Sequence, residues 1–190
     1  MKKKVMGITI GMLALLFMPM YAPATTLNVT NGRLMGANDV NVNGQYYNVA
    51  FIDGQYILLF PTGFVFQTQI TATAAAQALL DQVLINGIQG QFDDYPELTN
   101  GITDTQVGAI MTPYGHLEGV DVAIAYNYSA SGNADYVDIN TYGSTYDSTV
   151  DSEYTWAVWA VGQQVPEPAT MLLLGLGLMG VAGIRRKFKK

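Results

Sequence analysis

The stretch that decides the fold runs from residue 40 to residue 51 and reads VNVNGQYYNVAF. Val40 and Val42 alternate with asparagine before the Asn43-Gly44 pair, and Val49 and Phe51 continue the alternation after it. Alternation places every second side chain on the same face of a strand. An Asn-Gly pair between two such segments is typical of a tight β-hairpin turn. The segment therefore predicts two antiparallel strands joined by a two-residue turn.

The chain that follows is predicted to continue as an antiparallel meander. A second turn is expected at Asp53-Gly54, and it leads to an apolar strand at residues 56–60. Residues 61–63 read Pro-Thr-Gly and break this strand, because proline and glycine favour turns. Another apolar strand is predicted at residues 64–70.

One soluble helix is predicted, at residues 73–86. Its apolar residues follow the helical spacing i, i+3, i+4, i+7 and i+8, at Ala76, Leu79, Leu80, Val83 and Leu84. Gly87 is placed to end the helix as a C-terminal cap. The apolar stripe is most simply the face that covers the sheet, so no cofactor is needed to explain it. Residues 90–119 contain several turn signals and are left without an assigned structure.

Strands return in the second half of the domain. Residues 120–128 place Val, Val, Ile, Tyr and Tyr on one face, and two more strands are predicted at 135–142 and 154–161. In the last strand both faces are apolar, with Trp156 on one side and Trp159 on the other, which indicates a central strand. Residues 25–164 are therefore predicted to form an α+β domain, an antiparallel β-sheet with one packed amphipathic helix.

The charges are divided unevenly between the ends and the middle. Residues 25–164 carry fourteen acidic side chains against the single basic side chain of Arg33, a formal charge of −13. Nucleic acid is excluded as a partner, because phosphate binding needs clustered Lys and Arg. The chain has no cysteine, so disulfides, thiolate metal sites and cysteine nucleophiles are excluded as well.

The N-terminus has the three-part layout of a secretory signal peptide. A basic start at residues 2–4 is followed by an apolar stretch at 5–18 and by Ala22-Pro23-Ala24. An Ala-x-Ala sequence after a short apolar stretch is typical of a signal peptidase site. Residues 1–24 are therefore predicted to be removed by cleavage after Ala24. An uncleaved signal anchor is the alternative.

The C-terminus carries a motif, an apolar run and a basic tail. Pro166, Glu167 and Pro168 precede an uncharged run at residues 169–184, and the tail begins with Arg185, Arg186 and Lys187. Sixteen residues span only ~24 Å as a helix, less than the ~30 Å hydrocarbon core, so a membrane span here is short. The basic tail would stop at the cytoplasmic side, and the domain would then lie across the membrane.

These features together resemble the PEP-CTERM sorting signal of Gram-negative bacteria, over residues 165–190. Pro166, Glu167 and Pro168 match the motif that names the signal. The resemblance implies a transmembrane sorting helix and recognition by exosortase, a membrane-embedded cysteine transpeptidase or protease that cuts near the motif. It further implies transient anchoring in the inner membrane, followed by passage to the cell surface or an exopolysaccharide matrix. It says nothing about the domain between the two ends.

Three parts of the domain contain residue types that are typical of functional sites. Residues 39–44 fit the opening of a calcium loop, but Ala50 stands where an EF-hand needs its last carboxylate, so a hairpin turn is the better interpretation. His116 is the only histidine and has no flanking motif of a catalytic triad. Asp93, Asp94 and Glu97 are interpreted as solvated loop residues rather than as an acid/base pair.

The segment 135–153 is the remaining candidate. Its acidic residues stand among Tyr, Thr and Ser, at Asp135, Asp138, Asp147, Asp151 and Glu153. Calcium binding, stacking of tyrosines on a polysaccharide and ordinary solvated turns all fit this composition. No metal, cofactor or catalytic residue is predicted. We expect a non-enzymatic surface protein that is structural or binds extracellular polysaccharide; the alternative is a surface hydrolase with an unrecognised carboxylate site.

Overall fold

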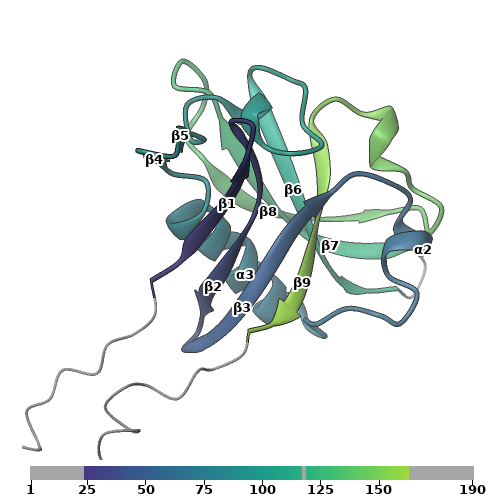
Figure 1. The fold of residues 1–190 in the computed structure, drawn as a ribbon. Coiled ribbons are helices and arrows are strands. Elements are labelled where there is room, and N and C mark those ends of the chain that lie inside the picture. Colours follow the sequence, from purple (N-terminus) through teal and green to yellow (C-terminus); the bar gives the residue numbers. More distant parts are fainter. Residues whose placement is uncertain (1–23, 117–118, 163–190) are drawn as a thin grey trace, which may run out of the picture. The chain divides into compact units, whose positions relative to one another are not determined.

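The computed structural model describes residues 24–116 and 119–162, which form a seven-stranded sheet with one long helix packed against it (Figure 1). Of the predicted processing sites, only Ala24 belongs to the described residues. Along the sheet the strand order is β1 (Thr26–Thr30), β2 (Arg33–Val42), β3 (Gln45–Ile52), β9 (Tyr154–Val161), β6 (Val107–Gly115), β7 (Val120–Tyr128) and β8 (Tyr136–Tyr142). The other elements are the helices α2 (Tyr56–Leu59) and α3 (Gln69–Gln82), the 3₁₀ helices η1 (Pro96–Leu98) and η2 (Ser148–Val150), and a small hairpin of β4 (Asn86–Gly87) and β5 (Gly90–Gln91).

The hairpin predicted from residues 40–51 is confirmed. β2 and β3 pair antiparallel, and the turn residues Asn43 and Gly44 have φ of 53° and 87°. A turn with positive φ at both central residues matches the twist of the flanking strands. The Asn41 side chain accepts a hydrogen bond from the Gly44 N–H at 2.8 Å and holds the turn from inside. The same asparagine and glycine that suggested a calcium loop therefore make a turn.

The predicted meander beyond β3 is wrong. Residues 56–59 form the short helix α2, and residues 64–70 form no strand, since α3 begins at Gln69. The reason is non-local: β3 pairs with β9 from the far end of the domain, so the chain after Gly54 leaves the sheet. Tyr56 then packs over the sheet, with its ring centroid 5.7 Å from that of Trp156.

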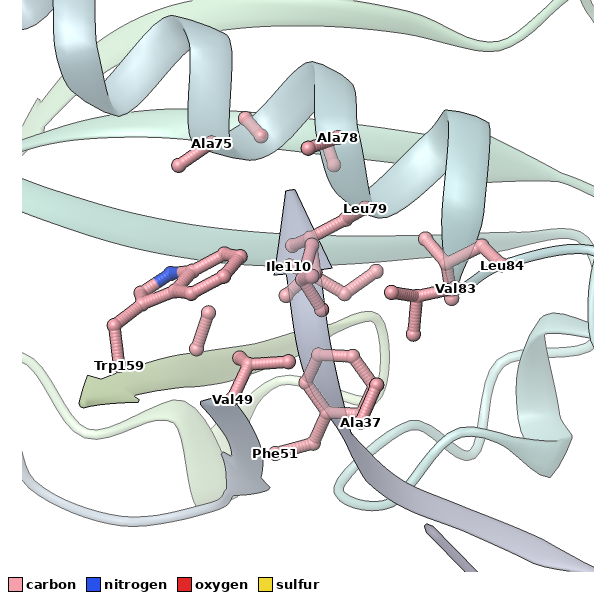
Figure 2. Close-up of a cluster of buried hydrophobic side chains, with 14 of the residues drawn as sticks. Ala37, Val49, Phe51, Ala75, Ala78, Leu79, Val83, Leu84, Ile110 and Trp159 are labelled. Carbon is pink, nitrogen blue, oxygen red and sulfur yellow. The ribbon is translucent and has the colours of Figure 1, made fainter. Parts of the chain in front are cut away.

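The predicted helix is confirmed with shifted ends. α3 begins at Gln69, where the Thr68 side chain accepts a hydrogen bond from the Thr71 N–H at 3.3 Å. It ends at Gln82, so Gly87 is not its cap and lies in β4 instead. The buried side of α3 consists mostly of alanines, which lets the helix approach the sheet closely; its buried residues are Ala72, Ala75, Ala76, Ala78 and Leu79. Figure 2 shows Ala75, Ala78 and Leu79 on this side.

The sheet is mixed rather than purely antiparallel. The unassigned segment 90–119 contains β6, which pairs antiparallel with β7 and parallel with β9. The strands predicted at 120–128, 135–142 and 154–161 are confirmed as β7, β8 and β9. β9 is central, as its two apolar faces predicted: Trp159 packs in the core beneath α3, and Trp156 packs on the opposite side.

Candidate binding surface

The face of the sheet opposite α3 carries a row of tyrosines, and we call it the tyrosine face. In β7, Ala123 and Ala125 point into the core beneath α3, whereas Tyr126 packs with the cluster on the other side. Tyr128 follows two residues later and shares that face, because strand side chains alternate. Tyr136 of β8 lies opposite Tyr126 in the register, so it joins them.

These three tyrosines form a stack. The ring centroids of Tyr126 and Tyr136 are 5.0 Å apart with 22° between the ring planes. Tyr128 lies 6.2 Å from Tyr136, with 18° between the planes, and 6.4 Å from Tyr126. Tyr136 is 44% exposed, and the other two are half-buried. The stack therefore offers flat aromatic surface to solvent at the β8 edge of the sheet.

A second aromatic group continues the tyrosine face toward its centre. Tyr142 and Tyr146 have ring centroids 4.6 Å apart, and Tyr154 lies 5.8 Å from Tyr142. Tyr146 also meets the buried Trp156 edge to face at 6.0 Å. Aromatic pairs at such separations stabilise beyond the area they bury. Where α3 covers one face of the sheet with a helix, aromatic side chains largely cover the other.

Four tyrosine hydroxyls of this face, those of Tyr126, Tyr136, Tyr146 and Tyr154, have a raised pKa and stay protonated at physiological pH. Burial raises the pKa of both Tyr126 and Tyr154. The neighbouring hydroxyls of Tyr142 and Tyr126 raise the pKa of Tyr154 further. The pKa of Tyr136 is raised mainly by its contact with Tyr128. The Tyr146 O–H donates a 2.7 Å hydrogen bond to Asp151, and burial together with that carboxylate raises its pKa. The face therefore presents neutral hydroxyls that both donate and accept hydrogen bonds.

The carboxylates predicted as one group at 135–153 are spread over separate local roles. Asp135 accepts a hydrogen bond from the Tyr128 N–H at 2.7 Å, and Asp138 accepts one from the neighbouring Ile139 N–H at 2.8 Å. Asp147 caps η2 through Thr149, whose hydroxyl and amide hydrogen bonds lower the pKa of Asp147. Among residues 24–116 and 119–162, no three His, Asp or Glu side chains are grouped to hold a metal ion.

The structure brings one unpredicted pair of carboxyls together. Burial raises the pKa of Asp135, and the nearby Asp93 raises it further, against the lowering effect of the Tyr128 amide. Asp93 itself accepts a 3.3 Å hydrogen bond from Asn86. The sequence had grouped Asp93 with Glu97 instead, but Glu97 stands in the first turn of η1. No local pattern connects residues 93 and 135, because their proximity follows from the packing of a loop on β7.

His116, the remaining candidate from the sequence, packs against an aromatic ring, and Arg33 donates hydrogen bonds to backbone carbonyls. His116 is exposed at the end of β6, and its ring meets that of Phe64 at 5.8 Å. Arg33, the domain's single basic residue, donates to the backbone carbonyls of Glu97 and Ile102 at 2.9 and 3.2 Å. It therefore ties β2 to the loop after η1.

The two processing regions fall almost entirely outside the described residues. Ala24 is exposed, and the next residue, Thr25, already donates hydrogen bonds from its hydroxyl to the Asp39 carbonyl and to Gln82. Ala22, the motif at 166–168, the span at 169–184 and the basic residues Arg185, Arg186 and Lys187 lie outside the description. Within the part that the structure describes, no helix is long and apolar enough to cross a membrane.

Comparison with known proteins identifies one end of the chain. Residues 164–187 match the PEP-CTERM protein-sorting motif, and this match includes Pro166, Glu167 and Pro168. No curated protein and no solved structure matches the chain. Residues 164–187 are thus a PEP-CTERM sorting motif, which indicates an exported exosortase substrate that is transiently anchored in the membrane and sorted to the cell surface.

Proposed function

We propose that the exported domain binds polysaccharide through its tyrosine face, at the surface or in the extracellular matrix of a Gram-negative bacterium, and that it is not an enzyme. The observation that carries this proposal is the partly exposed stack of Tyr126, Tyr128 and Tyr136. The C–H face of a sugar ring packs on an aromatic ring, and neighbouring hydroxyls of the sugar need hydrogen-bond partners. Partly exposed tyrosines supply both a flat apolar body and a polar tip.

The charge of the domain narrows the class of polysaccharide. Residues 25–164 carry a formal charge of −13, and Asp138 stands beside Tyr126 and Tyr136. A polymer rich in carboxylates or sulfates would be repelled by this field. Neutral or amino-bearing sugars fit the tyrosine face better.

Titration of the exported protein with the host's own extracellular polysaccharide tests the proposal. We expect saturable binding that is weakened about tenfold by Tyr136→Ala or Tyr128→Ala, since each removes one stacking ring worth ~1–3 kcal/mol in comparable aromatic contacts. Tyr95→Ala is the matched control, because Tyr95 is 48% exposed but stands outside the stack. Binding that Tyr95→Ala and Tyr136→Ala weaken equally, or no binding to any surface polymer, would remove the glycan proposal.

A surface hydrolase is the second candidate, and one feature favours it. Asp151 contacts the Tyr146 hydroxyl, and Glu153 lies close enough to Tyr146 to raise its pKa, so carboxylates border the aromatic surface. A glycosidase needs two carboxyls beside a bound sugar. Shortening of the polysaccharide that disappears in Glu153→Gln or Asp151→Asn would replace the binding proposal with an enzymatic one.

A further inference from the structure

The sheet splits between its two central strands. β6 and β9 pair in parallel for three residues only, ending at Met111 opposite Trp156. β6 nevertheless continues to Gly115, and β9 continues to Val161. Over these stretches β6 stays paired with β7 and β9 stays paired with β3. The two halves of the sheet therefore diverge and leave a fork between β6 and β9.

The fork holds a groove whose lining side chains are mostly apolar. Its volume is about 330 Å³, and none of its lining side chains is charged. Pro113 lines it from β6, Val158 and Trp159 from β9, and Phe60, Phe64 and Phe66 from the chain between α2 and α3. This volume is at the lower end of the ~300–1,000 Å³ of small-ligand pockets, so the groove admits a short segment.

The groove is closed on the side of the sheet that α3 covers. The Trp159 indole N–H donates to the Thr112 hydroxyl across the fork at 3.1 Å, and both side chains are buried. Phe66 packs on Trp159 with ring centroids 5.4 Å apart. Figure 2 shows Trp159 under the alanines of α3. An occupant would therefore enter from the opposite side of the sheet, past Val158 and Phe60.

The walls of the groove include unpaired strand backbone. Beyond Trp156, the N–H and C=O groups of β9 that point away from β3 have no strand partner among the described residues. The segment Phe64–Phe66 lies in the groove wall but makes no backbone hydrogen bond to either strand. Pro113 has no N–H and cannot extend the β6–β9 ladder. Backbone groups without partners are energetically costly once water is excluded, so the fork favours an occupant that brings its own backbone groups.

We propose that this fork is a binding site for an extended, apolar and non-acidic peptide segment of a partner protein, which adds to β9 as a strand. Apolar walls alone would suit a lipid tail or an aromatic ring, but such ligands satisfy no backbone group. A peptide strand satisfies both requirements: its main chain gives the hydrogen bonds, and its alternate side chains fill the pocket. The charge of −13 on residues 25–164 repels acidic segments. This site is separate from the tyrosine stack and does not depend on polysaccharide binding.

The test uses the full-length chain in lipid nanodiscs and a synthetic probe, the capped peptide Lys-Val-Thr-Val-Thr-Val-Lys. Binding is followed by tryptophan fluorescence, since Trp159 lines the groove, and by protection of the β9 amides from hydrogen exchange. Two N-methylated peptides, one modified at the valines and one at the threonines, keep the side chains but remove alternate amide donors. We expect saturable binding that at least one N-methylated peptide loses by about tenfold or more, the loss expected for one or two net hydrogen bonds.

Variants of the chain locate the site. Val158→Trp fills the groove and should weaken binding of the probe peptide about tenfold or more. Thr62→Trp at the exposed rim is a second blocking variant, and it leaves the core intact. Val150→Trp is the matched control, because Val150 is 75% exposed in η2 and stands outside the groove. Tyr136→Ala should bind the probe as the unmodified chain does. A failure of polysaccharide binding and a failure of peptide binding are thereby distinguished.

Several outcomes would overturn the proposal. Equal binding of the parent and both N-methylated peptides would leave only an apolar pocket, and binding unchanged by both blocking variants would place the peptide elsewhere. Self-association of the chain that Val158→Trp abolishes would make a second copy the occupant. Probe binding that requires removal of residues 163–190 would make the chain's own C-terminal segment the occupant.

Discussion

The two faces of the sheet are built from the same strands but are closed in opposite ways. On one face, α3 lies across the strands, and its buried alanines and Leu79 pack with Phe51 and Trp159 in one continuous core (Figure 2). On the other face, Tyr56 of α2 and partly buried aromatic side chains cover a second, smaller cluster that includes the buried Met111 and Trp156. The helix face therefore holds the larger buried cluster, and the tyrosine face keeps the partly exposed aromatic side chains on which the proposed binding depends.

The largest expected loss of stability comes from a substitution at the centre of the helix face. Leu79 is fully buried on the side of α3 that faces the sheet, so Leu79→Ala should lower the free energy of unfolding by about 3–5 kcal/mol, through lost burial and the cavity left behind. Urea denaturation measures the change. Ile70→Ala on the same helix is the control, because Ile70 is 80% exposed, and it should change stability by less than about 0.5 kcal/mol. Similar losses in both variants would contradict a helix packed through its alanine side.

A second variant tests the closeness of that packing. Ala75 is fully buried between α3 and the sheet, so Ala75→Leu should overpack the interface and cost about 1–3 kcal/mol. Gln69→Leu in the exposed first turn adds the same apolar side chain outside the interface and serves as control. A thermal melt compares the two. If Ala75→Leu raised the melting temperature, the interface would contain unfilled space.

The helix face is also the part that the sequence predicts well. The alternation around Asn43-Gly44 gives β2 and β3, and the 3.6-residue spacing around Leu79 gives α3, because both signals are local. The apolar residues on both sides of 154–161 even predict that β9 is central. The helix ends are less well predicted: Val83 and Leu84 continue the apolar pattern and are buried, yet the helix has already ended at Gln82.

What the sequence could not show depends on contacts between distant segments. β6 stays hidden because Pro113 and neighbouring glycines read as a loop, and its parallel pairing with β9 joins segments about forty-five residues apart (Ala109 opposite Tyr154). The sequence predicts two of the three stacked rings, because side chains alternate along residues 120–128 and place Tyr126 and Tyr128 on one face. The third ring, Tyr136, enters only through the β7–β8 register, and the fork appears only where two paired strands separate.

A third variant acts on the tyrosine face and should cost less than the helix-face changes. Tyr146→Phe removes the hydroxyl that donates to Asp151 at 2.7 Å but keeps the ring against Tyr142 and Trp156. We expect a loss of about 1 kcal/mol, the net value of one such hydrogen bond. Tyr95→Phe on exposed surface is the control and should be neutral. A loss as large as that of Leu79→Ala would show that the tyrosine face carries the fold as well.

The smallest effect concerns Asp135, which stands beside the tyrosine stack. Burial and Asp93 raise its pKa above the usual 3.8, so the folded protein holds this proton more tightly than the unfolded chain does. Its contribution to stability is therefore most favourable in acid and is lost as the pH rises through the raised pKa. Asp135→Asn keeps an oxygen that accepts from the Tyr128 N–H and removes the charge. It should be more stable than the parent chain at pH 7, by less than about 1 kcal/mol because the site is partly exposed and screened.

The pH dependence separates this effect from a simple change in packing. Urea denaturation between pH 4 and 7 should show the advantage of Asp135→Asn shrinking as the pH falls, because the parent carboxyl then takes up its proton. Asp147→Asn is the opposite control: hydrogen bonds from Thr149 lower the pKa of Asp147, so this variant should be less stable at pH 7, and the difference should close in acid. A stability difference for Asp135→Asn that stays constant with pH would mean that burial and Asp93 do not raise the pKa of this carboxyl, and that the variant acts through packing alone.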